Sequence, residues 1–118
     1  MAYVDGFLLV VPKKKLNAYR KLAAQAAPIF RKYGALEVRE CVADDLKAKF
    51  GVPFPKLVKP KAGETIVFSW IIYKSKSARD RANAKMMKDP GMANMDPKTM
   101  PFDMERMSYG GFRVIVDA

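Results

Sequence analysis

The chain of 118 residues contains no histidine and only one cysteine, Cys41. The absence of histidine excludes a Ser-His-Asp triad, a Cys-His pair, histidine-ligated zinc and a haem held by a proximal histidine. A single cysteine cannot form a disulfide within the chain or build a thiolate metal site or an iron–sulfur cluster alone. We therefore expect a protein of a reducing compartment that uses neither a metal nor a cofactor.

Long hydrophobic runs are also lacking. No apolar stretch approaches the roughly 20 residues that a membrane-spanning helix needs. The N-terminal sequence MAYVDGFLLVVPKKK places its lysines after the apolar segment, whereas a signal peptide places them before it. We interpret this segment as a strand of the mature protein and expect a cytoplasmic protein that does not enter a membrane.

Acidic residues are absent between Asp5 and Glu37, and the chain carries a net charge of +10. Basic residues concentrate in the same interval: Lys13, Lys14, Lys15, Arg20, Lys21, Arg31 and Lys32. Such a surface attracts nucleic acids or acidic ligands, but a solvated surface that promotes solubility has the same composition. The sequence leaves both interpretations open.

Half of the residues are hydrophobic, and the length fits one globular domain over residues 1–118. Hydrophobic periodicity predicts strands over residues 2–11, 36–42, 64–74 and 106–118. It predicts helices over residues 16–33 and 77–88. The order βαββαβ is that of an α+β ferredoxin-like plait, a four-stranded antiparallel sheet with both helices on one face.

Two local signals refine the predicted helices. Pro28 lies inside the first helix and should bend or locally break its last turns, because proline has no backbone N–H and clashes with the preceding turn. Ser77 and Asp80 have the spacing of an approximate capping box at the start of the second helix.

Both faces of the predicted sheet are apolar, whereas a sheet with one solvated face should alternate apolar and polar residues. The third strand places Ile66, Phe68, Trp70 and Ile72 on one face and Val67, Ser69, Ile71 and Tyr73 on the other. Because the helices can cover one face only, we expect the other to pack against a second subunit in a two-fold homodimer. An RNA-binding RRM has the same element order, but this strand lacks its glycine, basic and aromatic pattern.

Two connections have no regular pattern. Residues 43–63 hold three of the eight prolines, and their length is typical of functional or interaction segments. Residues 86–107 hold seven of the eight methionines, a residue that fills irregular gaps and contacts aromatic rings. We expect this second segment to form a lid over the mouth of a barrel, held by four aromatic residues: Tyr3, Phe102, Tyr109 and Phe112.

Four segments are spread along the chain from Tyr3 to Val116: YVDGFLLVVPKKKLNAYRKLA, GALEVRECVADD, ETIVFSWIIYKSKSARDRANAKMMKDP and MDPKTMPFDMERMSYGGFRVIV. In this order they resemble the YbaA-like family of uncharacterised bacterial proteins, a domain of unknown function, and the motif PFD…RM…GGF is the most specific part. The resemblance implies the dimeric α/β-barrel superfamily, in which two ferredoxin-like subunits pack sheet to sheet. Relatives there include cofactor-independent monooxygenases of antibiotic biosynthesis, haem-degrading enzymes and small isomerases. Roles that depend on a histidine in those relatives have no counterpart here.

Polar residues within the apolar elements are the candidate site residues: Arg39, Glu40, Ser69, Trp70, Asn83 and Arg113. Buried polar groups of this kind commonly form structural ion pairs or interface contacts. The alternative is a dry pocket for an aromatic or acidic small molecule, for which we predict six ligand-binding residues: Arg39, Trp70, Asn83, Met87, Met107 and Tyr109.

No constellation of residues dictates a reaction. The resemblance implies a homodimer that binds a small apolar or aromatic molecule, as a cofactor-independent oxygenase or isomerase or as a non-catalytic ligand-binding or structural dimer. A basic nucleic-acid-binding protein is the remaining alternative.

Three further positions carry structural expectations. Gly110-Gly111 permits a β-bulge or a close approach of the backbone. Asp5 is either an acid that lines the barrel or part of a bulge with Gly6. Cys41 is expected to be a small buried core residue.

Overall fold

The predicted strands form one four-stranded antiparallel sheet in the computed structural model, which describes residues 1–118. The strands are β1 (Tyr3–Pro12), β2 (Ala35–Val42), β3 (Glu64–Tyr73) and β4 (Ser108–Arg113), in the spatial order β2-β3-β1-β4. The α-helices are α1 (Leu16–Lys32), α2 (Phe54–Val58), α3 (Lys76–Met86) and α4 (Pro90–Ala93). Three short 3₁₀ helices complete the chain: η1 (Lys13–Lys15), η2 (Pro97–Thr99) and η3 (Met104–Arg106). The predicted ferredoxin-like α+β fold is confirmed.

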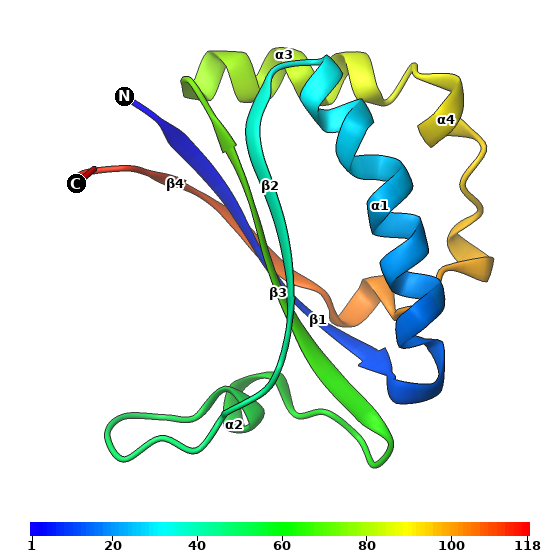
Figure 1. Ribbon diagram of the computed structural model, residues 1–118, viewed down its shortest axis with the longest axis vertical. Coiled ribbons are helices and arrows are strands. Elements are labelled where there is room, and N and C mark those ends of the chain that lie inside the picture. The colour runs from blue at the N-terminus through cyan, green and yellow to red at the C-terminus, as the bar shows by residue number, and fades with distance from the viewer.

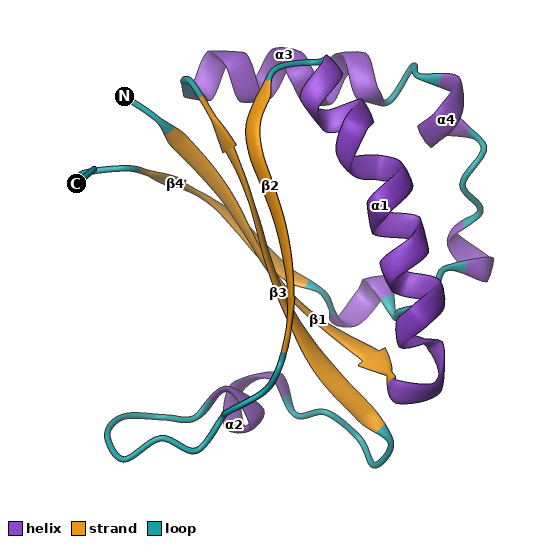
Figure 2. Ribbon diagram, viewed as in Figure 1, coloured by secondary structure: helices purple, strands orange, loops and turns teal.

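One side of the sheet is covered by α1, α3 and α4, whereas α2 lies on the opposite side (Figure 1; Figure 2). Two groups of buried side chains lie between the sheet and the helices. Leu9, Val11, Tyr19 and Val67 form the first group, and Ala35, Ile71, Tyr73 and Ala82 form the second. Alternate residues of β1 and β3 therefore face the helices, as the period of two in their sequences predicts.

Helix α1 runs without interruption through Pro28, so the predicted break does not occur. Its apolar stripe packs on the sheet, and the polar residues of its outer face are exposed to solvent. The chain then turns through Gly34, whose φ of +123° is a conformation that glycine adopts at little cost.

The predicted cap of the second long helix is wrong by one half-turn. Ser75, not Ser77, is the N-cap residue, because the backbone N–H of Ala78 donates to Ser75 Oγ at 3.1 Å. The helix also ends earlier than predicted, at Met86, because a separate helix starts at Pro90. Ser75 and Ser77 have similar chemistry, and only Ser75 accepts the bond from the first turn of the helix.

The last strand is shorter than predicted. It pairs with β1 from Ser108 to Arg113 only, and beyond it Ile115 and Val116 are about four-fifths exposed. Strand β1 ends its pairing at Tyr3, so the later residues of the chain have no partner strand within the subunit. The alternating apolar residues beyond Arg113 predicted a longer strand, which does not form because no neighbouring strand is available to them within the subunit.

The sheet face opposite α1 and α3 is called the open face below. Its residues include Val4, Leu8, Phe68, Trp70, Ile72 and Phe112. At one end of this face Val10 and Ile66 are buried where α2 packs on β1, and the rings of Phe54 and Phe68 lie 6.4 Å apart. The remainder stays accessible, with Phe112 63% exposed. The prediction that both faces are apolar is confirmed.

The methionine-rich segment does not lie over the open face. It follows α1 on the helix side, where Asn94–Pro101 borders the outer surface of that helix (Figure 1). The ring of Phe102 packs edge-on against Tyr19 at 5.7 Å, and Met107 contacts the first core group. Within the subunit Phe102 holds the segment against α1, while Phe112 lies on the open face. A lid over the mouth of a barrel that two subunits form stays a prediction.

Asp5 and Gly111 lie next to each other on β1 and β4 without a bulge. Asp5 is buried and forms an ion pair with Arg79 of α3, with 2.6 Å between the carboxylate Oδ1 and Nη1. Gly111 gives the ring of Tyr3 room to lie against the backbone, so the expected close approach is confirmed. The only register shift in the sheet lies between Ala35 and Glu37 at the start of β2.

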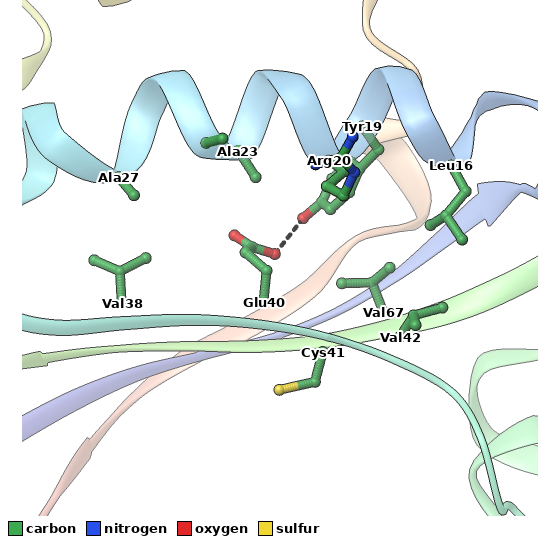
Figure 3. Close-up of a pocket in the computed structure, with 11 residues that line it drawn as sticks. Leu16, Tyr19, Arg20, Ala23, Ala27, Val38, Glu40, Cys41, Val42 and Val67 are labelled. Carbon is green, nitrogen blue, oxygen red and sulfur yellow. Dashed lines mark hydrogen bonds between the residues drawn. The ribbon is translucent and has the colours of Figure 1, made fainter.

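Cys41 is half-buried, not a core residue. It pairs in register with Phe68, and its side chain points away from α1 (Figure 3). None of the helices is both long and apolar enough to cross a membrane.

Candidate functional site

An apolar cleft of about 310 Å³ separates α1 from β2 and β3. Most of its lining is aliphatic or aromatic, and the helix contributes small residues that keep the space open (Figure 3). The lining residues of α1 are Leu16, Tyr19, Arg20, Ala23, Ala24 and Ala27. Those of the sheet are Val38, Glu40, Cys41, Val42 and Val67. The volume lies at the lower end of the range found for small-molecule sites, about 300–1,000 Å³.

Tyr19 and Glu40 face each other inside this cleft. Tyr19 belongs to the apolar stripe of α1, and Glu40 lies on the helix side of β2 between Val38 and Val42. The Tyr19 hydroxyl donates a hydrogen bond of 2.6 Å to Glu40 Oε1. The second carboxylate oxygen points toward the stretch of α1 between Ala23 and Ala27 (Figure 3). That oxygen is placed to accept a hydrogen bond from a bound molecule.

The apolar surroundings set the protonation of this pair. Burial raises the pKa of Glu40, and the hydrogen bond from Tyr19 lowers it again in part. Burial and the adjacent carboxylate raise the pKa of Tyr19, so the phenol keeps its proton and acts as the donor. Glu40 is nonetheless an exposed residue, so its carboxylate is only partly desolvated and stays accessible to a bound molecule.

Two of the six predicted site residues meet on the open face. The indole Nε1 of Trp70 donates to Glu37 Oε2 at 2.9 Å, and the guanidinium of Arg39 lies 3.2 Å from Glu37 Oε1. Tyr109 lies on the edge strand and stacks on Phe7 at 6.0 Å between ring centres. These contacts join Trp70 and Arg39 through an acid that the sequence did not single out.

The other three predicted residues lie elsewhere. Asn83 is exposed on α3, and Met87 follows that helix with 81% of its surface accessible. Met107 packs on the first core group. The six residues therefore do not line one cavity within a subunit, because Trp70 and Asn83 belong to opposite layers of the fold.

The open face carries a second hollow, of about 600 Å³. It borders β1, β3 and β4, and its large side chains are Leu8, Phe68, Trp70, Tyr109 and Phe112. The hollow is wide and shallow and holds no charged side chain. Its character is that of a surface that packs against another apolar surface.

The pair that the structure brings together, Tyr19 and Glu40, was only half recognisable from the sequence. Glu40 stands out as an acid between two valines of a strand. Tyr19 reads as an ordinary core position of α1, and it lies 21 residues away from its partner. Only the packing angle of α1 on the sheet connects the two.

The architecture defines a ferredoxin-like protein, and solved proteins share it over their full length. A dimeric ferredoxin-like protein from an uncultured marine organism has a TM-score of 0.60 at 12% identity and covers 100% of both chains. Rv0793 from Mycobacterium tuberculosis has a TM-score of 0.60 at 14% identity, over 100% of this chain and 99% of that one. An uncharacterised NIPSNAP domain protein from Burkholderia xenovorans has a TM-score of 0.58 at 14% identity, over 98% and 97%. At these identities the similarity shows the fold alone.

Sequence similarity gives the family. The chain belongs to the family described as "Protein of unknown function (DUF1428)", whose pattern matches residues 2–104. It is 50% identical over 117 residues to the uncharacterised protein YbaA of Escherichia coli K12, covering 99% of each chain. The YbaA protein of Shigella flexneri matches to the same extent. The resemblance predicted from the sequence is confirmed.

Proposed function

We propose that this protein is a homodimer that binds a small, mostly apolar metabolite in the cleft between α1 and β2. The observation that carries the binding proposal is the Tyr19–Glu40 pair, an acid and a phenol joined at 2.6 Å inside an apolar cleft of about 310 Å³. The pair leaves the second carboxylate oxygen of Glu40 without a hydrogen bond within the chain, and that oxygen points toward α1 (Figure 3). An aromatic molecule with one hydrogen-bond donor, such as a phenol or an indole, fits these surroundings.

The dimer proposal rests on the open face. Its aromatic residues are accessible in the single subunit, with Phe68 42% and Phe112 63% exposed. An apolar sheet face of this kind is stabilised when an identical face covers it. One structurally similar protein is described as dimeric, which supports the same arrangement here.

Residues 43–63, called the arm below, extend this surface. The arm includes α2 and projects from the open-face side of the sheet (Figure 1). It exposes three apolar side chains in addition to Phe54: Phe50 (91%), Val52 (61%) and Leu57 (64%). In the proposed dimer the arm lies against the second subunit, and this contact buries its exposed apolar side chains.

Glu40 also determines which reaction such a site supports. Isomerisation needs one group that takes a proton from a carbon beside a carbonyl and returns it to another carbon of the same molecule. Glu40 supplies this group because its carboxylate borders the cleft and is partly desolvated, and no cofactor is consumed. An oxygenase is the alternative enzyme class. There Glu40 takes the proton of a phenol hydroxyl, a ring carbon of the phenolate adds molecular oxygen, the resulting hydroperoxide takes the proton back, and loss of water leaves a quinone.

Ligand binding is tested with two probes, indole and 2-naphthol, by thermal shift and by NMR of the amides of α1 and β2. We expect both probes to raise Tm and to shift resonances around Tyr19 and Glu40. Ala27→Phe fills the cleft and should abolish both effects, whereas Ala84→Phe places the same ring on exposed α3 and should not. No response to either probe, or an equal response in the Ala27 variant, rejects the cleft as the binding site.

Dimerisation is tested by sedimentation equilibrium at micromolar concentration, where we expect about twice the 13.3 kDa chain mass. Phe112→Asp places a charge on the open face and should give monomers. Met87→Asp makes the same change at an exposed position on the helix side and should leave the mass unchanged. A monomeric wild-type protein removes the dimer proposal.

A second candidate function is nucleic-acid binding, which the exposed cations of η1 and α1 favour. All seven basic residues between Lys13 and Lys32 are exposed, and this part of the chain has no acid. Filter binding of single- and double-stranded RNA at 50 and 200 mM salt tests this candidate. Strong binding at low salt that falls steeply at high salt supports it, and no binding at 50 mM excludes it.

A further inference from the structure

The cleft between α1 and β2 does not end at its apolar part. A further hollow, of about 520 Å³ and separate from the one on the open face, continues along the same helix and strand. It shares Ala24, Ala27 and Val38 with the apolar cleft and adds Pro28, Arg31 and Arg39. The two spaces therefore form one groove. The end near Tyr19 is mostly apolar but includes Arg20, whose Nη2 donates to Asn17 Oδ1 at 2.9 Å, and the other end, near Arg31, is cationic.

Arg31 contacts no carboxylate at the cationic end. Its Nη1 donates to the backbone carbonyl of Leu36 at 2.9 Å, which orients the guanidinium but leaves its charge uncompensated. Arg39 borders this hollow from the edge strand β2, but it belongs to the open face, where it pairs with Glu37 at 3.2 Å, so Arg31 is the cation available to a ligand here. The groove thus has an unpaired, positioned cation at one end, and arginine binds carboxylates through two parallel hydrogen bonds.

From this arrangement we infer that the ligand of the groove is an amphipathic carboxylic acid, with its apolar body in the cleft and its carboxylate on Arg31. The inference rests on the proposed binding cleft and narrows its ligand to one chemical class. Glu40 lies along the same groove, with its second oxygen toward the stretch of α1 between Ala23 and Ala27, so it lies beside the apolar body of the acid and not beside the carboxylate on Arg31 (Figure 3). A neutral apolar ligand would use the cleft and leave the cationic end empty.

The length of the groove limits the size of the acid. Ala23 and Arg31 are eight residues apart on α1, which corresponds to about 12 Å along the helix axis. A short aromatic acid such as benzoate would reach only one end. An extended medium-chain acid such as decanoate reaches from the alanine-lined wall to the guanidinium.

The test compares decanoate with 1-decanol, which has the same chain without the charge, by isothermal titration calorimetry on the intact protein below the concentration at which decanoate aggregates. Wild-type protein should bind decanoate about tenfold more tightly than 1-decanol, a difference of about 1.4 kcal/mol. Arg31→Gln should remove this preference, and Arg31→Lys should retain part of it. Arg81→Gln removes the same charge from an exposed position on α3 and should keep the full preference.

The outcomes separate this inference from the proposed function. If indole and 2-naphthol bind but decanoate binds no more tightly than 1-decanol, the carboxylic acid is the wrong ligand class, and the proposed binding cleft is retained. If Arg31→Gln and Arg81→Gln weaken decanoate equally, net charge explains the preference and the inference fails. If no probe binds wild-type protein, both proposals fall. Circular dichroism of each variant confirms that its fold is intact before binding is compared.

Discussion

The hydrogen bond between Tyr19 and Glu40 affects the protonation of the carboxylate in the candidate site. The carboxylate has lost part of its water to the apolar cleft, and the phenol replaces some of that solvation at 2.6 Å. The pKa of Glu40 is raised by burial and held down by this one bond. Burial is the larger influence on the pKa of Glu40, and the bond from Tyr19 offsets part of it.

Replacing Tyr19 by phenylalanine should raise the pKa of Glu40 further, because the stabilising hydrogen bond disappears while the burial remains. An NMR titration that follows the Glu40 carboxyl carbon measures this directly. We also expect the free energy of unfolding at neutral pH to fall by about 1 kcal/mol. Tyr33→Phe is the matched control, since Tyr33 donates a bond of the same length, 2.6 Å, to Asp89 and does not contact Glu40. An unchanged Glu40 pKa in the Tyr19 variant would contradict this account.

Gly111 is a residue whose missing side chain shapes the sheet. A Cβ atom at this position would fall on the ring of Tyr3, 2.8 Å from Cζ, and the ring is held by the guanidinium of Arg79 at 4.8 Å. The ring therefore cannot move without disturbing the Asp5–Arg79 ion pair.

Gly111→Ala should lower the free energy of unfolding by about 1–3 kcal/mol, as overpacking of a well-packed region does. Gly110→Ala is the control, because its Cβ would meet only Phe112 at an ordinary 3.7 Å. Urea denaturation of both variants measures the difference. Equal stability of the two variants would show that the Tyr3 ring is not fixed.

At the scale of elements, the ion pair between Arg106 and Glu64 holds three segments of the chain together. Arg106 of η3 donates to both carboxylate oxygens of Glu64 at the start of β3, at 2.8 and 3.0 Å. Arg106 also donates to the carbonyl of Lys59, and the backbone N–H of Lys61 donates to Glu64. The end of the arm, the third strand and the end of the methionine-rich segment are thus held at one point.

This ion pair predicts a pH dependence of stability. The hydrogen bonds from Arg106 and the Lys61 backbone lower the pKa of Glu64 from 4.5 to about 2. A carboxyl whose pKa is lower in the folded protein stabilises the fold above the unfolded value and loses that contribution as pH falls. Wild-type protein should therefore exceed Glu64→Gln in stability at pH 6, and the difference should disappear between pH 4.5 and about 2.

Urea denaturation at a series of pH values measures the difference. The control is Glu105→Gln, an equal charge change at an exposed neighbouring position that forms no ion pair with Arg106. A constant difference between wild type and Glu64→Gln across this pH range would contradict the assignment.

The sequence predicts the elements of this fold well because each has its own periodicity. The period-two pattern of β3 and the apolar stripe of α1 are properties of consecutive residues, and both elements form within one or two residues of their predicted limits. The predicted element boundaries were wrong where a boundary depends on contacts with residues that are distant in the sequence. The end of β4, for example, depends on where β1 stops.

The candidate site was less predictable than the fold, for a related physical reason. Trp70 and Asn83 are polar residues in apolar elements, but strand register and helix rotation place them in different layers. Conversely, Tyr19 and Glu40 form a pair only because α1 crosses β2 at that point. Such pairings arise from packing between elements, and no spacing along the chain encodes them.

At the scale of the whole molecule, the distribution of apolar surface distinguishes the two sides. On the helix side most large apolar residues of β1 and β3 are buried within the subunit, whereas Phe68 and Phe112 of the open face and Phe50 and Leu57 of the arm are exposed. The arm begins on the open face through the Phe54–Phe68 contact and continues outward with further apolar side chains. This continuity makes the arm part of the surface that the proposed dimer covers.

The double variant Phe50→Ser, Leu57→Ser should weaken the dimer without unfolding the subunit. Both side chains are largely exposed in the single subunit, at 91% and 64%, so their removal costs the subunit little. Burying two such side chains against a partner contributes about 3 kcal/mol, which corresponds to roughly a 100-fold change in the dimer dissociation constant. Met87→Ser removes an equally exposed apolar side chain from the helix side and should leave that constant unchanged. Sedimentation equilibrium over a range of concentrations gives the dissociation constants. A wild-type dimer that the double variant does not weaken would place the arm outside the interface, and the exposed phenylalanine would then need another partner.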